Sequence, residues 1–229
     1  GWNSGSVDNN VGPGLLVQGA NSITWSGSIT ANAIGVRIEG GSSVTLQGSL
    51  TGNVGDGVRV SNGATDITLL GSISGNTGAG VRVISGQRIG FGESSGALIT
   101  DNGALGIDLV GGNENGFGVT FNDRGDLDVG PNNYQNFPDV RELKSRGDGN
   151  FAIRGVSCAG CIVRIYRQRV DPSGYGEAEN LIGQATTDEF GVFDLQIGLG
   201  LNLANIKLTL TAQRGGSTSE FGEGEEAEV

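Results

Sequence analysis

The chain has 229 residues and a formal net charge of −11, and it contains 44 glycines but no histidine. This acidic balance argues against nucleic acid and anionic membrane surfaces as partners, because both attract Lys and Arg. The lack of histidine removes the commonest general base, the usual catalytic triads and most zinc sites. No apolar run approaches the length of about 18 residues that a membrane-spanning helix needs, so no membrane span is expected. The chain begins at Gly1 and contains no Met, which indicates a processed form or a piece of a longer protein.

A short repeat occupies the N-terminal half. Each copy has an Asn, a short spacer, a Gly and an apolar–polar–apolar triplet, as in residues 53–60 and 76–83. The anchoring glycines are 21, 22, 23 and 26 residues apart, at Gly14, Gly35, Gly57, Gly80 and Gly106. This period is too short for a helical hairpin and suits a coil of short strands.

Each period holds three segments in which apolar and polar residues alternate, which is typical of strands with one buried face. Gly, Asn and Ser separate the segments and predict corners. The sequence therefore predicts a parallel β-helix of about five coils, with three strands in each. Stacked corners would bring five asparagines into a hydrogen-bonded ladder, namely Asn10, Asn32, Asn53, Asn76 and Asn102.

After Leu109 the period is lost. The motifs GPNN at 130–133 and QNFP at 135–138 resemble the closing coil of secreted bacterial right-handed parallel β-helix repeat proteins of the surface-adhesin type. The motifs DPSGYGE at 171–177 and STSEF at 217–221 are similar to the immunoglobulin-like module that follows this coil in that family. The resemblance implies an all-β fold, a short right-handed β-helix followed by an Ig-like β-sandwich, and an extracellular or cell-surface location.

The C-terminal half also predicts a β-sandwich from its own pattern, because strand-like segments recur about every 12 to 20 residues between 151 and 212. We expect three parts: a β-helix with its closing loop at 1–140, the Ig-like sandwich at 141–222 and an acidic tail at 223–229. Glutamates begin to cluster at Glu220, and such a segment is usually solvated. If it is ordered, an outward row of arginines in a neighbouring copy (Arg37, Arg59 and Arg82) is one candidate for holding it.

Two groups of residues near the middle of the chain could serve as binding or cross-linking sites. Asp123, Asp126 and Asp128 lie within six residues on a Gly-rich loop, and their oxygens could bind Ca²⁺; a loop that caps its own backbone is the alternative. Cys158 and Cys161 form a CxxC pair followed by a strand rather than a helix. This context favours a disulfide that staples a turn, with two free thiols as the alternative.

Arg37, Arg59 and Arg82 occupy the same outward position in consecutive coils. They could bind an acidic glycan or an acidic protein segment, or they could form a solvated ladder without a ligand.

Three functions remain open at this stage. The first is a non-catalytic extracellular structural or adhesive surface protein, which could be a fibre subunit joined head-to-tail by strand addition between copies. The second is a polysaccharide-active β-helix lyase or hydrolase, for which Asp101 and Asp108 are the candidate carboxylates. The third is a monomeric glycan-binding module. The expected partners are further copies, other surface proteins or glycans.

Overall fold

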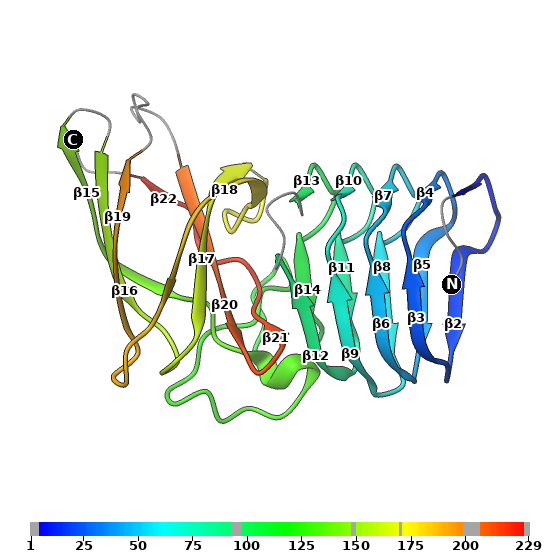
Figure 1. Cartoon of the computed structure of the whole chain (residues 1–229), viewed down its shortest axis with the longest axis horizontal. Helices are drawn as coiled ribbons and strands as arrows, with labels where there is room; N and C mark the ends of the chain where they lie inside the picture. The colour runs from blue at the N-terminus through cyan, green and yellow to red at the C-terminus, as the bar shows by residue number, and fades with distance from the viewer. Residues whose placement is uncertain (1–4, 93–97, 148–149, 170, 199–206, 227–229) are drawn as a thin grey trace.

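The computed structural model describes residues 5–92, 98–147, 150–169, 171–198 and 207–226. Within them the chain is all-β, and its one helical element is the short 3₁₀ segment η1 (Pro131–Tyr134). A solenoid forms the N-terminal half and a second β unit forms the C-terminal half, so that the two termini lie toward opposite ends of the long axis (Figure 1).

The solenoid has three parallel sheets, each built from one strand of every turn. The first contains β1 (Ser6–Asp8), β4 (Ser28–Thr30), β7 (Ser49–Thr51), β10 (Ile73–Ser74) and β13 (Ile99–Thr100). The second contains β2 (Pro13–Gln18), β5 (Ile34–Glu39), β8 (Val58–Ser61), β11 (Val81–Val83) and β14 (Ile107–Leu109). The third contains β3 (Asn21–Trp25), β6 (Ser42–Leu46), β9 (Ala64–Leu69) and β12 (Gly86–Phe91).

The solenoid has about four turns rather than the five coils expected, because the third sheet stops at β12. After β14 the chain leaves the coil and enters a long loop. Part of this loop returns beside β12, where Ile89 N–H donates to Asn132 Oδ1 (2.9 Å) and Asn132 Nδ2 donates to the Ile89 carbonyl (2.8 Å). The Asn132 side chain therefore occupies part of the edge where a fifth strand of this sheet would pair.

Like residues stack along the solenoid. Val36 pairs with Val58 and Val58 pairs with Val81, and all three side chains are buried in one core. This confirms the alternation predicted from the sequence. Each fully buried Val, Leu or Ile of this kind stabilises the fold by roughly 1.5–3 kcal/mol relative to an exposed position.

The predicted asparagine ladder is also confirmed. Along it, the side-chain amide of each Asn donates to Oδ1 of the next, from Asn32 to Asn53 (3.2 Å), Asn53 to Asn76 (2.8 Å) and Asn76 to Asn102 (2.9 Å). The backbone N–H of each donates to the same oxygen. The ladder therefore has a polarity, with donors facing the C-terminal end of the solenoid.

Two antiparallel sheets form the second unit. One contains β15 (Asp139–Gly147), β16 (Asn150–Val156) and β19 (Val192–Gly198). The other contains β18 (Glu177–Thr186), β17 (Ile162–Arg169), β20 (Lys207–Arg214) and β21 (Ser217–Thr218), with β22 (Glu225–Glu226) also paired to β20. Apolar side chains from both sheets share one core, among them Phe151 and Phe193 from the first sheet and Val163 and Leu210 from the second.

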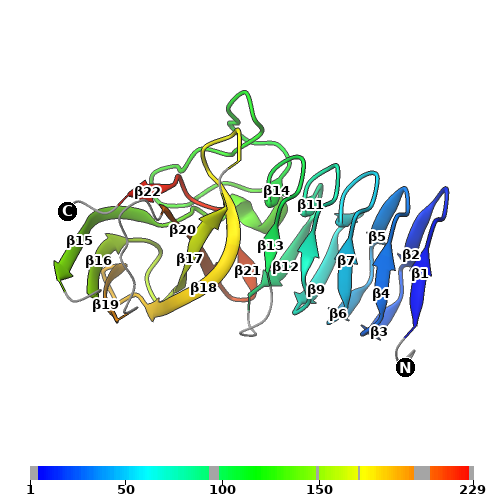
Figure 2. The same ribbon diagram turned by 90° about the horizontal axis from the view of Figure 1, so that it is seen from above.

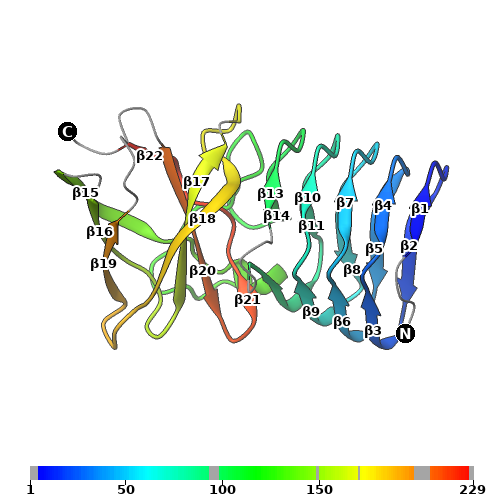
Figure 3. The same cartoon turned by 45° about the horizontal axis from the view of Figure 1, so that its top comes forward.

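The two halves are joined by a continuous sheet. Ile99 in β13 pairs antiparallel with Ala178 in β18, which merges the first solenoid sheet with the β18–β21 sheet into ten strands. Figures 2 and 3 show β18 lying next to the last solenoid turn. Tyr166, Ala178 and Phe221 of the second unit pack into the solenoid core. The second unit therefore covers the C-terminal end of the solenoid.

Candidate functional site

Side-chain oxygens of the second unit accept hydrogen bonds from N–H groups at the C-terminal end of the solenoid. We call this region the seam: the last strands β12 and β14, residues 110–138, and the parts of β18, β20 and β21 that meet them. Glu177 takes the place of a further ladder rung, because its carboxylate accepts from Asn102 N–H (3.1 Å) and Asn102 Nδ2 (2.8 Å). The carboxylate suits the polarity of the ladder, which ends in donors.

Glu220 closes a second edge of the seam. Its carboxylate accepts from the N–H groups of Leu109 and Thr120, each at 2.8 Å, and its side chain is buried. Burial raises the pKa of Glu177 to about 7 and that of Glu220 to about 8, while the amide donors facing each group favour its charged form. Neither role follows from the local sequence, because each donor lies 75 to 111 residues away.

Hydroxyl groups of β21 satisfy the outer edge of β12. The Arg88 N–H donates to Ser217 Oγ (3.1 Å), and the Phe91 N–H donates to Thr218 Oγ1 (3.0 Å). On this edge β12 has no further solenoid strand to pair with, so its backbone N–H groups need other acceptors. The hydroxyl groups of the short polar strand β21 supply them.

The described part of the acidic C-terminal segment is held within its own chain. Glu220 is buried in the seam, β22 pairs with β20, and Glu226 forms an ion pair with Lys207 (3.1 Å). Contacts to a neighbouring copy are therefore not needed to order residues 220–226. Residues 227–229, the end of the expected tail, lie outside the described residues.

The arginine row lies where the sequence predicts it. Arg37, Arg59 and Arg82 are paired in register on β5, β8 and β11. Buried Asp56 binds Arg59 (2.7 Å) and Arg82 (3.3 Å), and Arg37 forms an ion pair with Glu39. The like charges are thus compensated by carboxylates of the same chain, and the guanidinium groups remain partly exposed.

The two candidate catalytic carboxylates occupy different environments. Asp101 follows β13 and forms an exposed ion pair with Arg169 (2.8 Å). Asp108 lies in β14, is buried, and forms an ion pair with Arg82 (2.9 Å). Burial raises the pKa of Asp108 to about 6. The structure therefore places the two carboxylates in separate ion pairs on different sheets.

Two of the three loop aspartates, Asp123 and Asp126, accept hydrogen bonds from their own loop. Asp126 accepts from Asn136 N–H (2.8 Å) and Gln135 Nε2 (3.0 Å), and Asp123 accepts from Leu127 N–H (3.3 Å). Burial raises the pKa of Asp126. Among the described residues, no three His, Cys, Asp or Glu side chains gather into a group able to hold a metal ion. These contacts match the capping-loop alternative, and calcium binding through Asp123, Asp126 and Asp128 stays a prediction.

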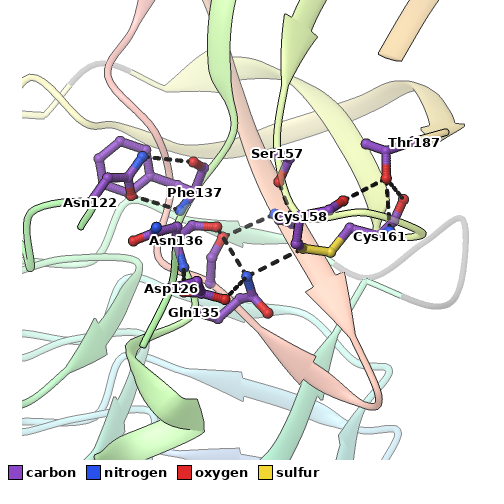
Figure 4. The surroundings of a disulfide bond; sticks show 11 residues. Asn122, Asp126, Gln135, Asn136, Phe137, Ser157, Cys158, Cys161 and Thr187 are labelled. Carbon is purple, nitrogen blue, oxygen red and sulfur yellow. Dashed lines mark hydrogen bonds between the residues drawn. A yellow bond between two sulfur atoms is a disulfide. The ribbon is translucent and has the colours of Figure 1, made fainter. Parts of the chain in front are cut away.

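Cys158 and Cys161 form a disulfide at a turn of the second unit that faces the seam. Figure 4 shows Gln135 and Thr187 on either side of it. Gln135 Nε2 donates to Cys158 Sγ (3.3 Å), while Thr187 Oγ1 donates to the Cys158 carbonyl (2.6 Å) and accepts from the Cys161 N–H (2.8 Å). Gln135 therefore connects the disulfide-bonded turn to the loop segment that contains Asp126.

A cavity of about 560 Å³ opens on the seam. It lies where the start of β12, the loop around η1 and the β20–β21 turn meet. Its lining consists of Gln87, Arg88, Asp126, Asp128, Asn133, Gln135, Arg214, Gly215 and Ser217. All of these residues are polar or glycine, so the cavity offers charges and hydrogen-bonding groups rather than an apolar surface.

Comparisons with protein families and with curated proteins give no indication of the function. No protein-family model matches the chain, and no curated protein matches it. Among the described residues, no helix has the length and apolar character to cross a membrane.

Proposed function

We propose that this protein is a non-catalytic structural or adhesive component of the extracellular surface. The observation that supports this function best is the ten-stranded sheet that runs through both halves. Such a sheet resists bending between the halves, because relative motion would break the β13–β18 pairing and the buried contacts of Tyr166 and Phe221. A stiff, elongated body suits a spacer or a fibre subunit.

An extracellular location is part of the proposal. The Cys158–Cys161 disulfide supports it, since disulfides persist mainly in oxidising compartments. Two antiparallel sheets around a shared core support an Ig-like module after a right-handed β-helix, the order found in the surface-adhesin proteins that the sequence resembles.

Self-association is proposed to occur head-to-tail through strand addition. The second unit covers one end of the solenoid, so a contact between copies would use the other end. There, β1, β2 and β3 each pair on one side only within the described residues. The second unit offers β15 and β19, the outer strands of its three-stranded sheet. Pairing between these unlike edges would not close and would extend into a filament.

Sedimentation velocity and negative-stain imaging of the purified protein test this function, each with and without a calcium chelator. We expect filaments or rods of several copies, and dissociation by the chelator would support a calcium-binding seam loop. A uniform monomer that binds glycans would favour the glycan-binding module instead. Release of reducing sugar or unsaturated products from polygalacturonate, alginate or chondroitin, abolished by Asp108→Asn, would contradict a non-catalytic role.

A further inference from the structure

We infer that the seam cavity binds a saccharide that carries a carboxylate, such as a uronic acid unit of an extracellular polysaccharide. This inference rests on the proposed adhesive function and names the class of ligand. The cavity lies outside the arginine row and outside the solenoid face that carries Asp108.

The walls of the cavity are fixed by contacts within the protein. Gln87 Nε2 donates to the Gly130 carbonyl (2.6 Å), and the Arg88 N–H donates to Ser217 Oγ (3.1 Å). The Arg88 guanidinium is bound by Asp66, which holds the arginine in place. A binding site with walls set in this way loses little conformational entropy when a ligand enters.

The turn between β20 and β21 also has little room to move. A Cβ atom on Gly216 would lie 3.3 Å from Cβ of Arg88, and Gly216 has a φ of 90°, a conformation that favours glycine. This close approach places Arg214 and Gly215 at the rim of the cavity.

Two charged groups in the lining form no ion pair within 4 Å in the described part of the chain, although the positive charge of Arg214 acts to lower the pKa of the nearby Asp126. The exposed Arg214 guanidinium forms no ion pair there, and the Asp128 carboxylate accepts no hydrogen bond there. Asp126, by contrast, is already bound by Asn136 N–H and Gln135 Nε2. Arg214 is therefore the guanidinium free to take an anion from outside, and Asp128 is the carboxylate free to accept hydroxyl donors.

These free groups define the ligand chemistry. A guanidinium binds a carboxylate through two parallel hydrogen bonds, which gives both strength and orientation. Asp128 accepts from hydroxyl groups, and the exposed Asn133 carboxamide both donates and accepts. The volume lies within the range of roughly 300–1,000 Å³ of small-molecule sites. A carboxylate attached to a polyhydroxylated ring meets all three groups, and the polar lining disfavours apolar ligands.

Isothermal titration calorimetry of the whole protein tests the inference, with trigalacturonate, neutral galactotriose and free glutamate as probes and a calcium chelator in the buffer. We expect saturable binding of trigalacturonate and at least about tenfold weaker binding of the neutral trisaccharide. Arg214→Gln should weaken trigalacturonate binding by about tenfold or more, and Asp128→Asn should weaken it as well. Arg154→Gln is the matched control, since Arg154 lies in β16 and pairs loosely with Asp194 (3.9 Å).

The inference is overturned if trigalacturonate fails to bind, if the neutral trisaccharide binds equally well, or if Arg214→Gln binds like the control. Binding of glutamate alone would identify a site for zwitterions and also overturn it. Unfolding midpoints of the variants show whether lost binding comes from misfolding, and Asp128→Asn gives a second readout if Arg214→Gln is unstable. Cleavage of the trisaccharide would refute the non-catalytic function while leaving the binding measurement intact. Loss of binding without any effect on rod assembly would refute the inference alone.

Discussion

Replacing Asn53 by Ala removes one rung from the middle of the ladder. The Asn53 side chain is buried and makes four hydrogen bonds: its amide donates to Asn76 Oδ1 (2.8 Å) and to the Ile29 carbonyl (3.4 Å). Its Oδ1 accepts from the Asn32 N–H (3.0 Å) and from Asn32 Nδ2 (3.2 Å). The change leaves the Asn32 N–H buried without this acceptor.

An orphaned buried donor costs about 1–3 kcal/mol, and each further lost bond contributes about 1 kcal/mol. Three bonds are lost besides that of the Asn32 N–H, so we expect Asn53→Ala to lower the free energy of unfolding by about 4–6 kcal/mol. Urea unfolding measures this as a lower midpoint with an unchanged slope. Asn21→Ala is the matched control, because Asn21 also bonds to the next turn but is exposed (Ser42 N–H to Asn21 Oδ1, 2.9 Å). A loss of less than about 1 kcal/mol for Asn53→Ala, or equal losses for both variants, would refute the reasoning.

Three further changes test the packing, the arginine row and the seam. Gly48→Ala should lower the free energy of unfolding by about 3 kcal/mol, because the new Cβ would lie 1.7 Å from the Gly27 carbonyl oxygen. Gly12→Ala is the control: its Cβ would meet no atom within 4 Å, so the urea midpoint should stay unchanged. Asp56→Ala should cost about 3 kcal/mol by removing a buried carboxylate that binds two arginines; a midpoint within error of wild type would mean that the row needs no internal counter-charge. The pKa of Glu220 rises from 4.5 to about 8 on folding, so its contribution to stability is full below pH 4.5 and is lost as the pH rises through 8. Urea midpoints measured across this range should fall with pH, and Glu220→Gln should flatten that fall; an identical slope in wild type and variant would show that another group causes it.

The solenoid could be predicted in detail because its signals are local. The spacing of the glycines and the alternation around Val36, Val58 and Val81 fix both the strands and the stacking. The asparagine ladder follows from the same period. The number of turns was overestimated, because the fifth triplet at Ile107–Leu109 looks like the others although the third sheet does not continue beside it.

The seam could not be predicted because its contacts join distant segments. Phe91 and Thr218 are 127 residues apart, and Leu109 and Glu220 are 111 residues apart. From the sequence, Glu220 is simply the first residue of an acidic segment, whereas in the fold it is a buried acceptor. The pairing of Glu39 with Arg37 could be predicted because the two residues lie two apart on one face of a strand, whereas the role of Asp56 could not, for a related reason. Asp56 lies in a spacer between Asn53 and the triplet, and only the corner geometry turns its carboxylate toward Arg59 and Arg82.

The joining of both halves into one body is tested most directly by equilibrium unfolding with two probes on the same sample. Trp25 lies in β3, so the tryptophan fluorescence of a Trp2→Phe variant reports on the solenoid, and hydrogen exchange of peptides from β16 and β17 reports on the second unit. The continuous sheet and the shared core predict coincident urea transitions for the two probes. Separate midpoints, with one half protected while the other exchanges freely, would contradict a single rigid rod.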